Sequence, residues 1–296
     1  MKRILVTGAT GNVGMEVIRS LLLKNSGYRI VAGVRNVSQA RKKFAENENI
    51  EFAAFDFEDP STFKTAFENI QSLFLLRPPH ISQVDRFFKP LMEAVRQSGI
   101  REIIFLSVQG AETSKMIPHN QIEKLIVDSG VPYIFLRPSY FMQNLTTTLV
   151  KDIQQKRKII LPAGKAKFNW IDITNIGETT AILFIRFDEY ANCAIELTGN
   201  ENISFGEVAD LISALTSVNV EFLNVNPFRF YRIKKQEGMA QGMIIVMILL
   251  HFLPRFQKEP RISEFYHQLT GKQPTSIKEF LLRENGKFMT NNVSSN

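Results

Sequence analysis

Three glycines near the start of the chain have a spacing suited to binding phosphate groups. Gly8, Gly11 and Gly14 follow a short apolar run and precede an amphipathic stretch that ends near Leu23. A tight glycine turn lets bare backbone approach a pyrophosphate, and the N-terminus of the following helix faces its negative charge. Because a strand comes before the motif and a helix after it, we predict a dinucleotide site. Its phosphate cradle would be formed by Gly8, Thr10, Gly11, Asn12 and Val13.

The residue type after the second apolar run bears on which dinucleotide is bound. An acidic residue there would accept hydrogen bonds from a ribose 2′-hydroxyl and favour NAD, whereas a cation favours the 2′-phosphate of NADP. The sequence has Arg35 at this place and no acid at the strand end. We therefore predict NADP, with a solvated surface arginine as the alternative interpretation.

Other candidate residues follow further strand-like runs. Ligands of open α/β sheets collect outside the carboxyl ends of the strands. Asp56, followed by Phe57, could meet the adenine amino group, although a helix cap is the alternative. Leu76, Arg77 and Ser107 would border the nicotinamide half of the site, and Arg77 could instead be a loop charge.

Alternating strands and helices must position these residues. Apolar runs rich in Ile, Val, Leu and Phe alternate with helical stretches, which is typical of a parallel sheet covered on both faces. The predicted strands are Arg3–Thr7, Arg29–Val34, Ile50–Phe55, Ser72–Leu76, Glu102–Ser107 and Tyr133–Leu136. The predicted helices between them are Val13–Lys24, Ser38–Asn47, Ser61–Glu68, Gln83–Ser98 and Ser114–Ser129.

Beyond Pro138 the alternation loosens. We predict helices over Gln143–Gln155, Ile176–Arg186 and Phe205–Leu215, strands over Ala194–Leu197 and Val220–Val225, and mostly helix from Phe228 to Leu282. The fold class is α/β, a Rossmann-type doubly wound parallel sheet with a smaller, mostly helical C-terminal substrate lobe. The predicted domains are residues 1–150, joined by 165–200, and a lobe over 201–284, with a flexible tail at 285–296.

Composition and charge indicate which kinds of partner this protein is expected to bind. The 296 residues carry a net charge of +7, but Lys and Arg divide evenly between the two halves of the chain. No concentrated basic tract is visible, so we expect no nucleic-acid partner. The single cysteine, Cys193, is expected to be buried and suits a reducing compartment such as the cytoplasm. We predict no metal site.

We expect neither a signal peptide nor a transmembrane segment. The most apolar run, Met243–Leu253, is short for a bilayer span of about 20 residues. A buried or partner-covered helix is the preferred interpretation of this run, and attachment to a membrane surface is the alternative.

Several later motifs resemble those of a known family. His119 and Glu123 precede a segment in which Arg137 and Pro138 lead to Tyr140, Phe141 and Asn144. With the glycine loop, they resemble the NmrA-like family of atypical short-chain dehydrogenases/reductases, which includes NADP-sensing regulators, NADPH-dependent quinone reductases and triphenylmethane reductases. The resemblance covers nearly the whole chain, although residues 227–258 match weakly. It implies that the nicotinamide ring is lined by Arg137, Pro138, Tyr140, Phe141 and Asn144. A structural ion pair is the alternative interpretation of Arg137.

The sequence also departs from the catalytic pattern of standard short-chain dehydrogenases/reductases. Standard short-chain enzymes use a Tyr-x-x-x-Lys pair, in which Lys lowers the pKa of the proton-donating Tyr. The corresponding residues here are His119 and Glu123, and a carboxylate cannot lower a tyrosine pKa. Reversible alcohol–ketone chemistry is therefore not expected.

Reduction of an electron-poor small molecule needs little concerted proton donation and remains open. His119 is the predicted proton donor near neutral pH, ahead of Tyr140, with Ser107 as a hydrogen-bond donor. Glu123 would contact the cofactor ribose or amide. We predict an NADPH-dependent reductase of an acceptor such as a quinone. The alternative is a catalytically inactive NADP sensor that acts through a protein partner; a homodimer is also compatible with the sequence.

Overall fold

The computed structural model of the protein describes residues 2–24, 27–44, 47–113, 115, 117–216 and 218–289, and the chain divides into two compact units. The first unit comprises Met1–Pro138, Ile173–Leu197 and Gln268–Thr270, and the second comprises the rest. The first boundary thus falls at Pro138 rather than at residue 150. Residues 165–172 belong to the second unit, and the chain returns to the first only at Ile173.

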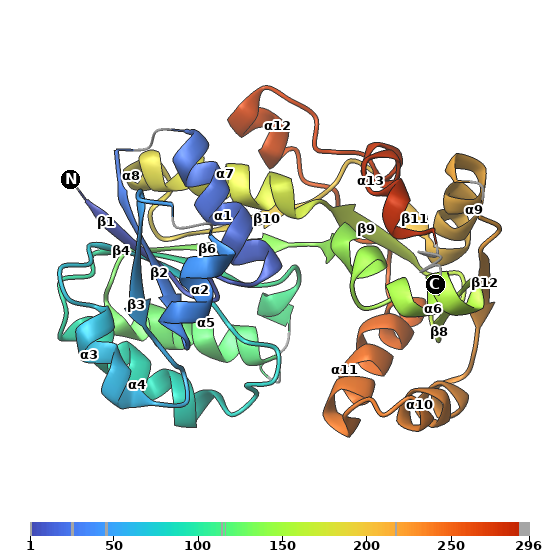
Figure 1. Ribbon diagram of the computed structural model, residues 1–296, viewed down its shortest axis with the longest axis horizontal. Helices are drawn as coiled ribbons and strands as arrows, with labels where there is room; N and C mark the ends of the chain where they lie inside the picture. The colour runs from blue at the N-terminus through green and yellow to red at the C-terminus, as the bar shows by residue number, and fades with distance from the viewer. Residues whose placement is uncertain are drawn as a thin grey trace, which may run out of the picture. The chain divides into compact units, whose positions relative to one another are not determined.

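A seven-stranded parallel sheet forms the centre of the first unit (Figure 1). Its strand order is β10-β6-β5-β4-β1-β2-β3, so the order reverses beside β1. The strands are β1 (Arg3–Val6), β2 (Arg29–Val34), β3 (Ile50–Ala54), β4 (Ser72–Leu76), β5 (Glu102–Leu106), β6 (Tyr133–Pro138) and β10 (Cys193–Leu197). This confirms the predicted doubly wound fold, and every predicted strand of this sheet lies within two residues of an observed one.

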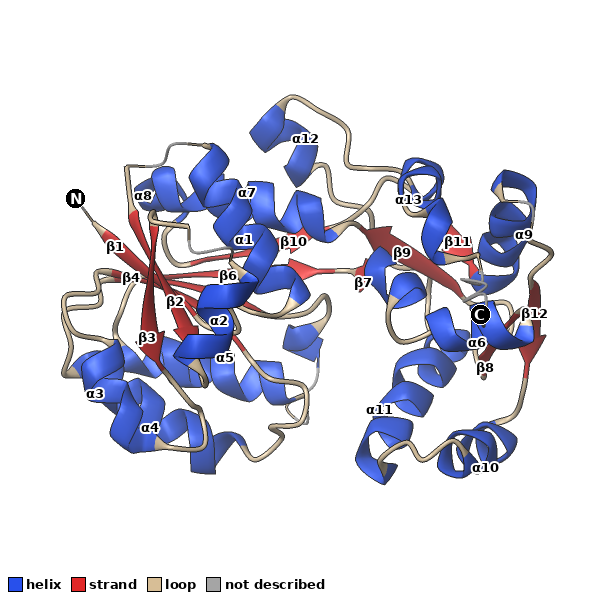
Figure 2. Ribbon diagram, in the orientation of Figure 1, coloured by secondary structure: helices blue, strands red, loops and turns tan. Residues whose placement is uncertain are grey.

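Helices cover both faces of this sheet (Figure 2). They are α1 (Asn12–Leu23), α2 (Val37–Lys43), α3 (Phe63–Ala66), α4 (Val84–Arg96), α5 (Pro118–Ser129), α7 (Ile173–Ile185) and α8 (Phe187–Tyr190). Helix α1 packs against α7, and α4 packs against α5. Under α3 and α4, Phe55, Phe63 and Phe67 stack in a buried aromatic cluster. The helix expected over Ser38–Asn47 ends at Lys43, and the one expected from Ser114 begins at Pro118. Residues 45, 46, 114 and 116 lie outside the described residues.

The second unit contains more strand than expected. A three-stranded sheet has the order β11-β9-β7, and β12 pairs with β8 in a second sheet. The strands are β7 (Tyr140–Phe141), β8 (Lys158–Leu161), β9 (Lys167–Ile171), β11 (Asn202–Ser204) and β12 (Glu221–Asn224). The helices are α6 (Val150–Lys156), α9 (Phe205–Leu215), α10 (Pro227–Gln236), α11 (Gln241–Phe252) and α13 (Ile277–Arg283), while α12 (Phe265–Thr270) is shared by both units.

Three expectations about the later chain are wrong. The helix expected over Gln143–Gln155 is broken into a 3-10 turn, η3 (Met142–Thr146), and α6, because three consecutive threonines disfavour helix between them. The expected tail is folded in its first part: Asn285–Lys287 form a 3-10 turn, and Phe288 is fully buried. Residues 290–296 lie outside the described part of the chain. Cys193 is exposed, because β10 is an edge strand.

Candidate functional site

The glycine loop after β1 has a backbone that only glycine fits. Gly8 has a φ of +62°, and the N–H of Gly11 donates to its carbonyl oxygen at 2.9 Å. A Cβ atom on Gly14 would lie only 2.3 Å from that same oxygen. The loop and the first turn of α1 are therefore pressed together, and a side chain at Gly14 would push them apart.

This loop leaves the N-terminus of α1 open for an anion. Gly11 is the N-cap residue, and no side chain caps α1. The first backbone N–H groups of a helix have no partner inside the helix and carry the positive end of its dipole. Gly11 and Asn12 are exposed, whereas Val13 is buried and fixes the helix to the sheet. The uncapped start of α1 could therefore hold a phosphate group, as the predicted cradle requires.

The cradle lies at the point where the strand order reverses. β1 pairs with β2 on one side and with β4 on the other. Buried Thr7 joins β1 to β4, because its hydroxyl donates to the Phe74 carbonyl at 3.1 Å and accepts from the Leu76 N–H at 2.9 Å. The Leu76 side chain packs against Gly8. In open α/β sheets this reversal is where ligands bind. Sequence reasoning missed Thr7, which it treated only as the end of a strand.

Two cations lie near the glycine loop or the end of β2. Arg35 directly follows β2 and is exposed, with no charged partner among the residues that the structure describes. Lys43, at the end of α2, donates from Nζ to the Thr10 carbonyl oxygen at 2.6 Å. Sequence reasoning missed Lys43, because only the folded chain brings α2 back to the loop. Both cations are available to an anionic group in this part of the first unit.

The structure separates the roles of Asp56 and Phe57. Asp56 is half-buried, and its Oδ1 accepts from the Glu58 N–H at 3.0 Å. The nearby 3-10 turn is capped by Asp59 instead, whose Oδ1 accepts from the Ser61 N–H. The Phe57 side chain is buried against Phe88, so only its backbone could reach a ligand.

A buried network occupies the place of the usual Tyr-x-x-x-Lys pair. Ser107 donates from Oγ to Glu123 at 2.6 Å. Arg137 donates to both oxygens of the same carboxylate, from Nε to Oε1 at 2.9 Å and from Nη2 to Oε2 at 2.7 Å. Its Nη1 donates to Glu112 Oε2 at 2.8 Å. These contacts raise the pKa of Arg137, chiefly through the hydrogen bond to Glu123. Since both oxygens of Glu123 are engaged, any contact of this carboxylate with a cofactor must compete with Ser107 and Arg137.

His119 lies beside Arg77 at the start of α5. Arg77 donates from Nε to His119 Nε2 at 3.4 Å, so the neutral ring holds its proton on Nδ1. Burial, and then the charge of Arg77, lower the pKa of His119 to about 3. The expectation of proton donation by an imidazolium near neutral pH therefore does not fit these surroundings. Arg77 itself is held by backbone carbonyls, including that of Ile81 at 2.6 Å.

The second unit has its own buried polar pair. Tyr140 lies 3.0 Å from His251 Nε2, and His251 Nδ1 lies 2.6 Å from the Met247 carbonyl oxygen. The carbonyl can only accept, so Nδ1 carries the proton and the Tyr140 hydroxyl donates to Nε2. Burial raises the pKa of Tyr140 and lowers that of His251 to about 4. At neutral pH the Tyr140 hydroxyl therefore keeps its proton and donates a hydrogen bond to His251 within this unit. Phe141 and Asn144 are half-buried in this unit, and Pro138 is the buried last residue of β6 in the first.

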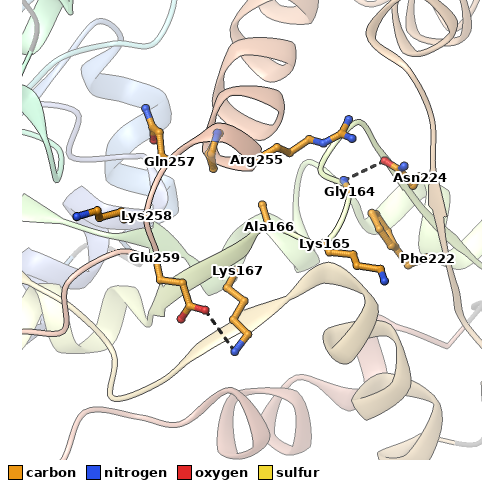
Figure 3. Close-up of a pocket in the computed structure, with 11 residues that line it drawn as sticks. Gly164, Lys165, Ala166, Lys167, Phe222, Asn224, Arg255, Gln257, Lys258 and Glu259 are labelled. Carbon is orange, nitrogen blue, oxygen red and sulfur yellow. Dashed lines mark hydrogen bonds and ion pairs between the residues drawn. The ribbon is translucent and has the colours of Figure 1, made fainter.

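A cavity of about 800 Å³ also lies in the second unit and contains none of the predicted site residues (Figure 3). Its lining includes Lys165, Lys167, Arg255 and Lys258, with Phe222 at one side. Lys167 pairs with Glu259 at 3.5 Å, and Asn224 accepts from the Gly164 N–H at 2.9 Å, as Figure 3 shows.

Comparison with known proteins decides the family. The sequence model of the NmrA-like family matches residues 1–281. The chain belongs to the NmrA-like family. Two relatives are prestalk A differentiation protein A of Dictyostelium discoideum, 27% identical over 94% of this chain and 90% of the relative, and the NAD(P)H azoreductase of Xenophilus azovorans, 26% identical over 94% and 96%. An NADPH-dependent quinone oxidoreductase of Escherichia coli, solved with NADPH, shares the fold with a TM-score of 0.81, at 22% identity over 95% of this chain and 99% of that one.

In this NmrA-like protein, the structure gathers only part of the predicted site. Within the first unit, Leu76 packs against the glycine loop, and hydrogen bonds join Ser107 to Glu123 and Arg77 to His119. Tyr140, Phe141 and Asn144 belong to the second unit. Among the described residues, no group of three or more His, Cys, Asp or Glu is placed to hold a metal ion. No helix in the described part of the chain is long and apolar enough to span a bilayer.

The low pKa of His119 gives a first testable expectation. Its imidazole should show no titration between pH 5 and 8 in an NMR experiment with labelled histidine, because the folded pKa is about 3. In an Arg77→Gln variant the ring loses the neighbouring positive charge, so its pKa should rise. Below pH 6.5 His119 binds a proton in the unfolded chain but not in the folded chain. The free energy of unfolding therefore decreases as the pH falls from 6.5 toward 3. A wild-type transition near pH 6.5 would contradict the described environment.

Proposed function

We propose that this protein is an NADPH-dependent reductase of a small, electron-poor acceptor such as a quinone. The observation that carries the proposal is the open cradle at Gly8, Gly11 and Gly14 before an uncapped helix, together with the exposed Arg35 at the end of β2. Family membership supports it, as do relatives whose names specify NAD(P)H azoreductase and NADPH-dependent quinone oxidoreductase activity. The single cysteine suits a reductase of the cytoplasm.

The first unit supplies the groups that would hold the cofactor. The backbone N–H groups at the start of α1 fit a pyrophosphate, because no side chain caps them. Arg35 would pair with the 2′-phosphate, and Lys43 adds a second positive charge beside Thr10. Asp56 would meet the adenine end, and Leu76 and Ser107 would border the nicotinamide. The family resemblance assigns Pro138, Tyr140, Phe141 and Asn144 to the same ring. NADPH, when bound, supplies a hydride.

The surrounding protein groups favour acceptors that need no strong acid. The Ser107 hydroxyl donates a hydrogen bond to Glu123, and the Tyr140 hydroxyl donates one to His251. His119 is neutral at pH 7. A ketone would need a proton as its alkoxide forms. A quinone spreads the negative charge of the added hydride over its conjugated ring, so water can protonate it afterwards, and a cationic dye is neutralised by the hydride and needs no proton. The reaction class therefore fits the groups present.

The test of this function uses the purified full chain. NADPH is mixed with a panel of benzoquinones and naphthoquinones, and the loss of nicotinamide absorbance is followed. We expect turnover of at least one quinone and none of simple ketones. Tight NADPH binding without turnover of any acceptor would overturn the reductase proposal.

Arg35 should set the cofactor preference. In Arg35→Ala, we expect the Kd for NADPH to rise about tenfold to a hundredfold, the range for losing a charge-assisted contact. The Kd for NADH should change little, because NADH has no 2′-phosphate. Lys42→Ala, which removes an exposed cation from α2, is the matched control and should leave both constants unchanged. If Arg35→Ala raised the Kd for NADPH and the Kd for NADH equally, Arg35 would not be the residue that recognises the 2′-phosphate.

The closed Ser107–Glu123–Arg137 network favours a second candidate, an NADP-binding sensor without turnover. A sensor needs the cradle but no proton donor, and the network leaves no free acid at the usual place. The quinone panel separates the two candidates, because only the sensor binds NADPH and reduces nothing.

A further inference from the structure

We propose that α10, α11 and the 3-10 turn η4 (Leu253–Phe256) form a surface that attaches the protein to an anionic lipid bilayer. We call the exposed side chains of residues 227–256 the apolar–basic surface. The proposal rests on the exposure and charge of these residues and is independent of the reductase proposal.

The first argument is the concentration of exposed apolar side chains. Among the described residues, eight of the fourteen exposed large hydrophobic side chains belong to residues 227–256. They are Phe228, Met243, Ile245, Val246, Leu249, Leu250, Leu253 and Phe256. Phe228 is 72% exposed and Phe256 is 73% exposed. An apolar patch of this kind marks an interaction surface rather than ordinary surface scatter.

Helix α11 shows how the patch arises. It is apolar on all sides, but only Ile244, Met247 and His251 are buried, and these residues form one stripe at helical spacing. The remaining sides, which include Val246 and Leu250, are exposed. The expectation of a buried or partner-covered helix is therefore wrong in its first part, because only one stripe of the helix packs within the second unit.

The second argument is charge. Residues 227–256 contain five Lys and Arg but only one acid, Glu237, in a chain whose net charge is +7. Lys234 is buried and neutralised by Asp152 and Glu237, and Glu237 also pairs with Lys156. The exposed charges that remain are cationic: Arg229, Arg232, Lys235 and Arg255. Sequence inspection missed this cluster, because its cations are interspersed among apolar residues over thirty positions and form no run.

The third argument is the way the cations lie on aromatic rings. Arg232 lies 6.0 Å from the Phe228 ring centre, Lys235 lies 5.8 Å from Tyr231, and Arg255 lies 5.2 Å from Phe252. Such pairs suit the boundary between headgroups and acyl chains, where the ring enters the apolar layer and the cation stays at the phosphates. Helices α10 and α11 pack together within the second unit, so their exposed side chains lie on neighbouring parts of its surface.

These observations favour a lipid surface over a second copy of the chain. A two-fold symmetric contact would place this cationic surface against itself, and like charges would oppose the contact. An anionic bilayer instead complements the charge and accepts the apolar side chains. The helices lie on the bilayer in this proposal, since no helix of the described residues is long enough to cross it.

Vesicle flotation with the full chain tests the proposal. One set of vesicles is pure phosphatidylcholine, and the other contains about one-third phosphatidylglycerol. We expect binding at least about tenfold tighter to the anionic vesicles, because each surface cation contributes about fivefold near such a membrane. Binding should weaken when salt rises from about 0.1 M to about 1 M. Hydrogen exchange of residues 241–253 should slow when anionic vesicles are added.

Two variants separate the apolar and basic contributions. Leu249→Ser/Leu250→Ser should lose about tenfold in affinity for anionic vesicles, and Arg229→Gln/Arg232→Gln should lose about tenfold as well. Leu282→Ser, which changes an equally exposed leucine on α13, is the control and should bind as wild type does. Because all these positions are exposed, the variants should fold, which circular dichroism checks.

Two results would overturn the proposal. One is equal or undetectable flotation of the wild-type protein with both vesicle types. The other is a dimer in sedimentation velocity that Leu249→Ser/Leu250→Ser abolishes, which would assign the surface to a second copy.

Discussion

Replacing Gly14 by alanine is expected to disrupt the cradle and to lower the stability of the first unit. The new Cβ would lie 2.3 Å from the Gly8 carbonyl oxygen and 2.8 Å from the Ala9 Cα, and these backbone atoms cannot rotate away. Alanine favours helix over glycine by about 1 kcal/mol, so the clash must first cancel that gain. We expect a net loss of about 2 kcal/mol in the free energy of unfolding and at least about a hundredfold loss in NADPH affinity.

Gly242 provides a matched control. It also lies in the first turn of a helix, α11, but a Cβ there would meet nothing within 4 Å. Gly242→Ala should therefore stabilise the protein by up to about 1 kcal/mol and leave NADPH binding unchanged. Urea unfolding and fluorescence titration with NADPH measure both effects. If Gly14→Ala were as stable as Gly242→Ala, the close approach between the loop and α1 would be disproved.

The glycine loop could be predicted from sequence because its determinants are local. A strand, a glycine turn and an amphipathic helix occupy adjacent positions, and each has its own periodicity. The same reasoning located the parallel strands, since long apolar runs separated by helices leave few alternatives. The short strands β8 and β9 were missed, because four- or five-residue apolar runs do not distinguish strand from buried helix.

The electrostatics of the candidate site could not be predicted, because they depend on contacts distant in sequence. The pKa of His119 is low because the folded chain buries the ring and also places Arg77, 42 residues away in sequence, beside it. An ion pair was one interpretation of Arg137, but its spacing from Glu123 gave no sign that this single carboxylate would hold both Arg137 and Ser107.

Glu123→Gln should destabilise the first unit by about 3 kcal/mol in urea unfolding, because it leaves the Arg137 charge without its buried partner. The side chains of Arg137 and Glu123 are only 13% and 7% exposed, and the remaining partner, Glu112, is 48% exposed. Glu189→Gln is the control. It breaks the exposed Arg186–Glu189 pair, which solvent screens, so the free energy of unfolding should not change measurably.

The double variant Glu123→Leu/Arg137→Met tests whether the two charges act as a unit. Removing both leaves no unpaired buried charge, so the double variant should be more stable than Glu123→Gln, although Ser107 loses its acceptor. If the costs of the single variants Glu123→Leu and Arg137→Met simply add to that of the double variant, the two side chains stabilise the protein independently. An effect of Glu123→Gln below about 0.5 kcal/mol would instead mean that solvent screens the pair as it screens the surface control. The expected non-additivity follows from burial, since two charges removed from water depend on each other for compensation.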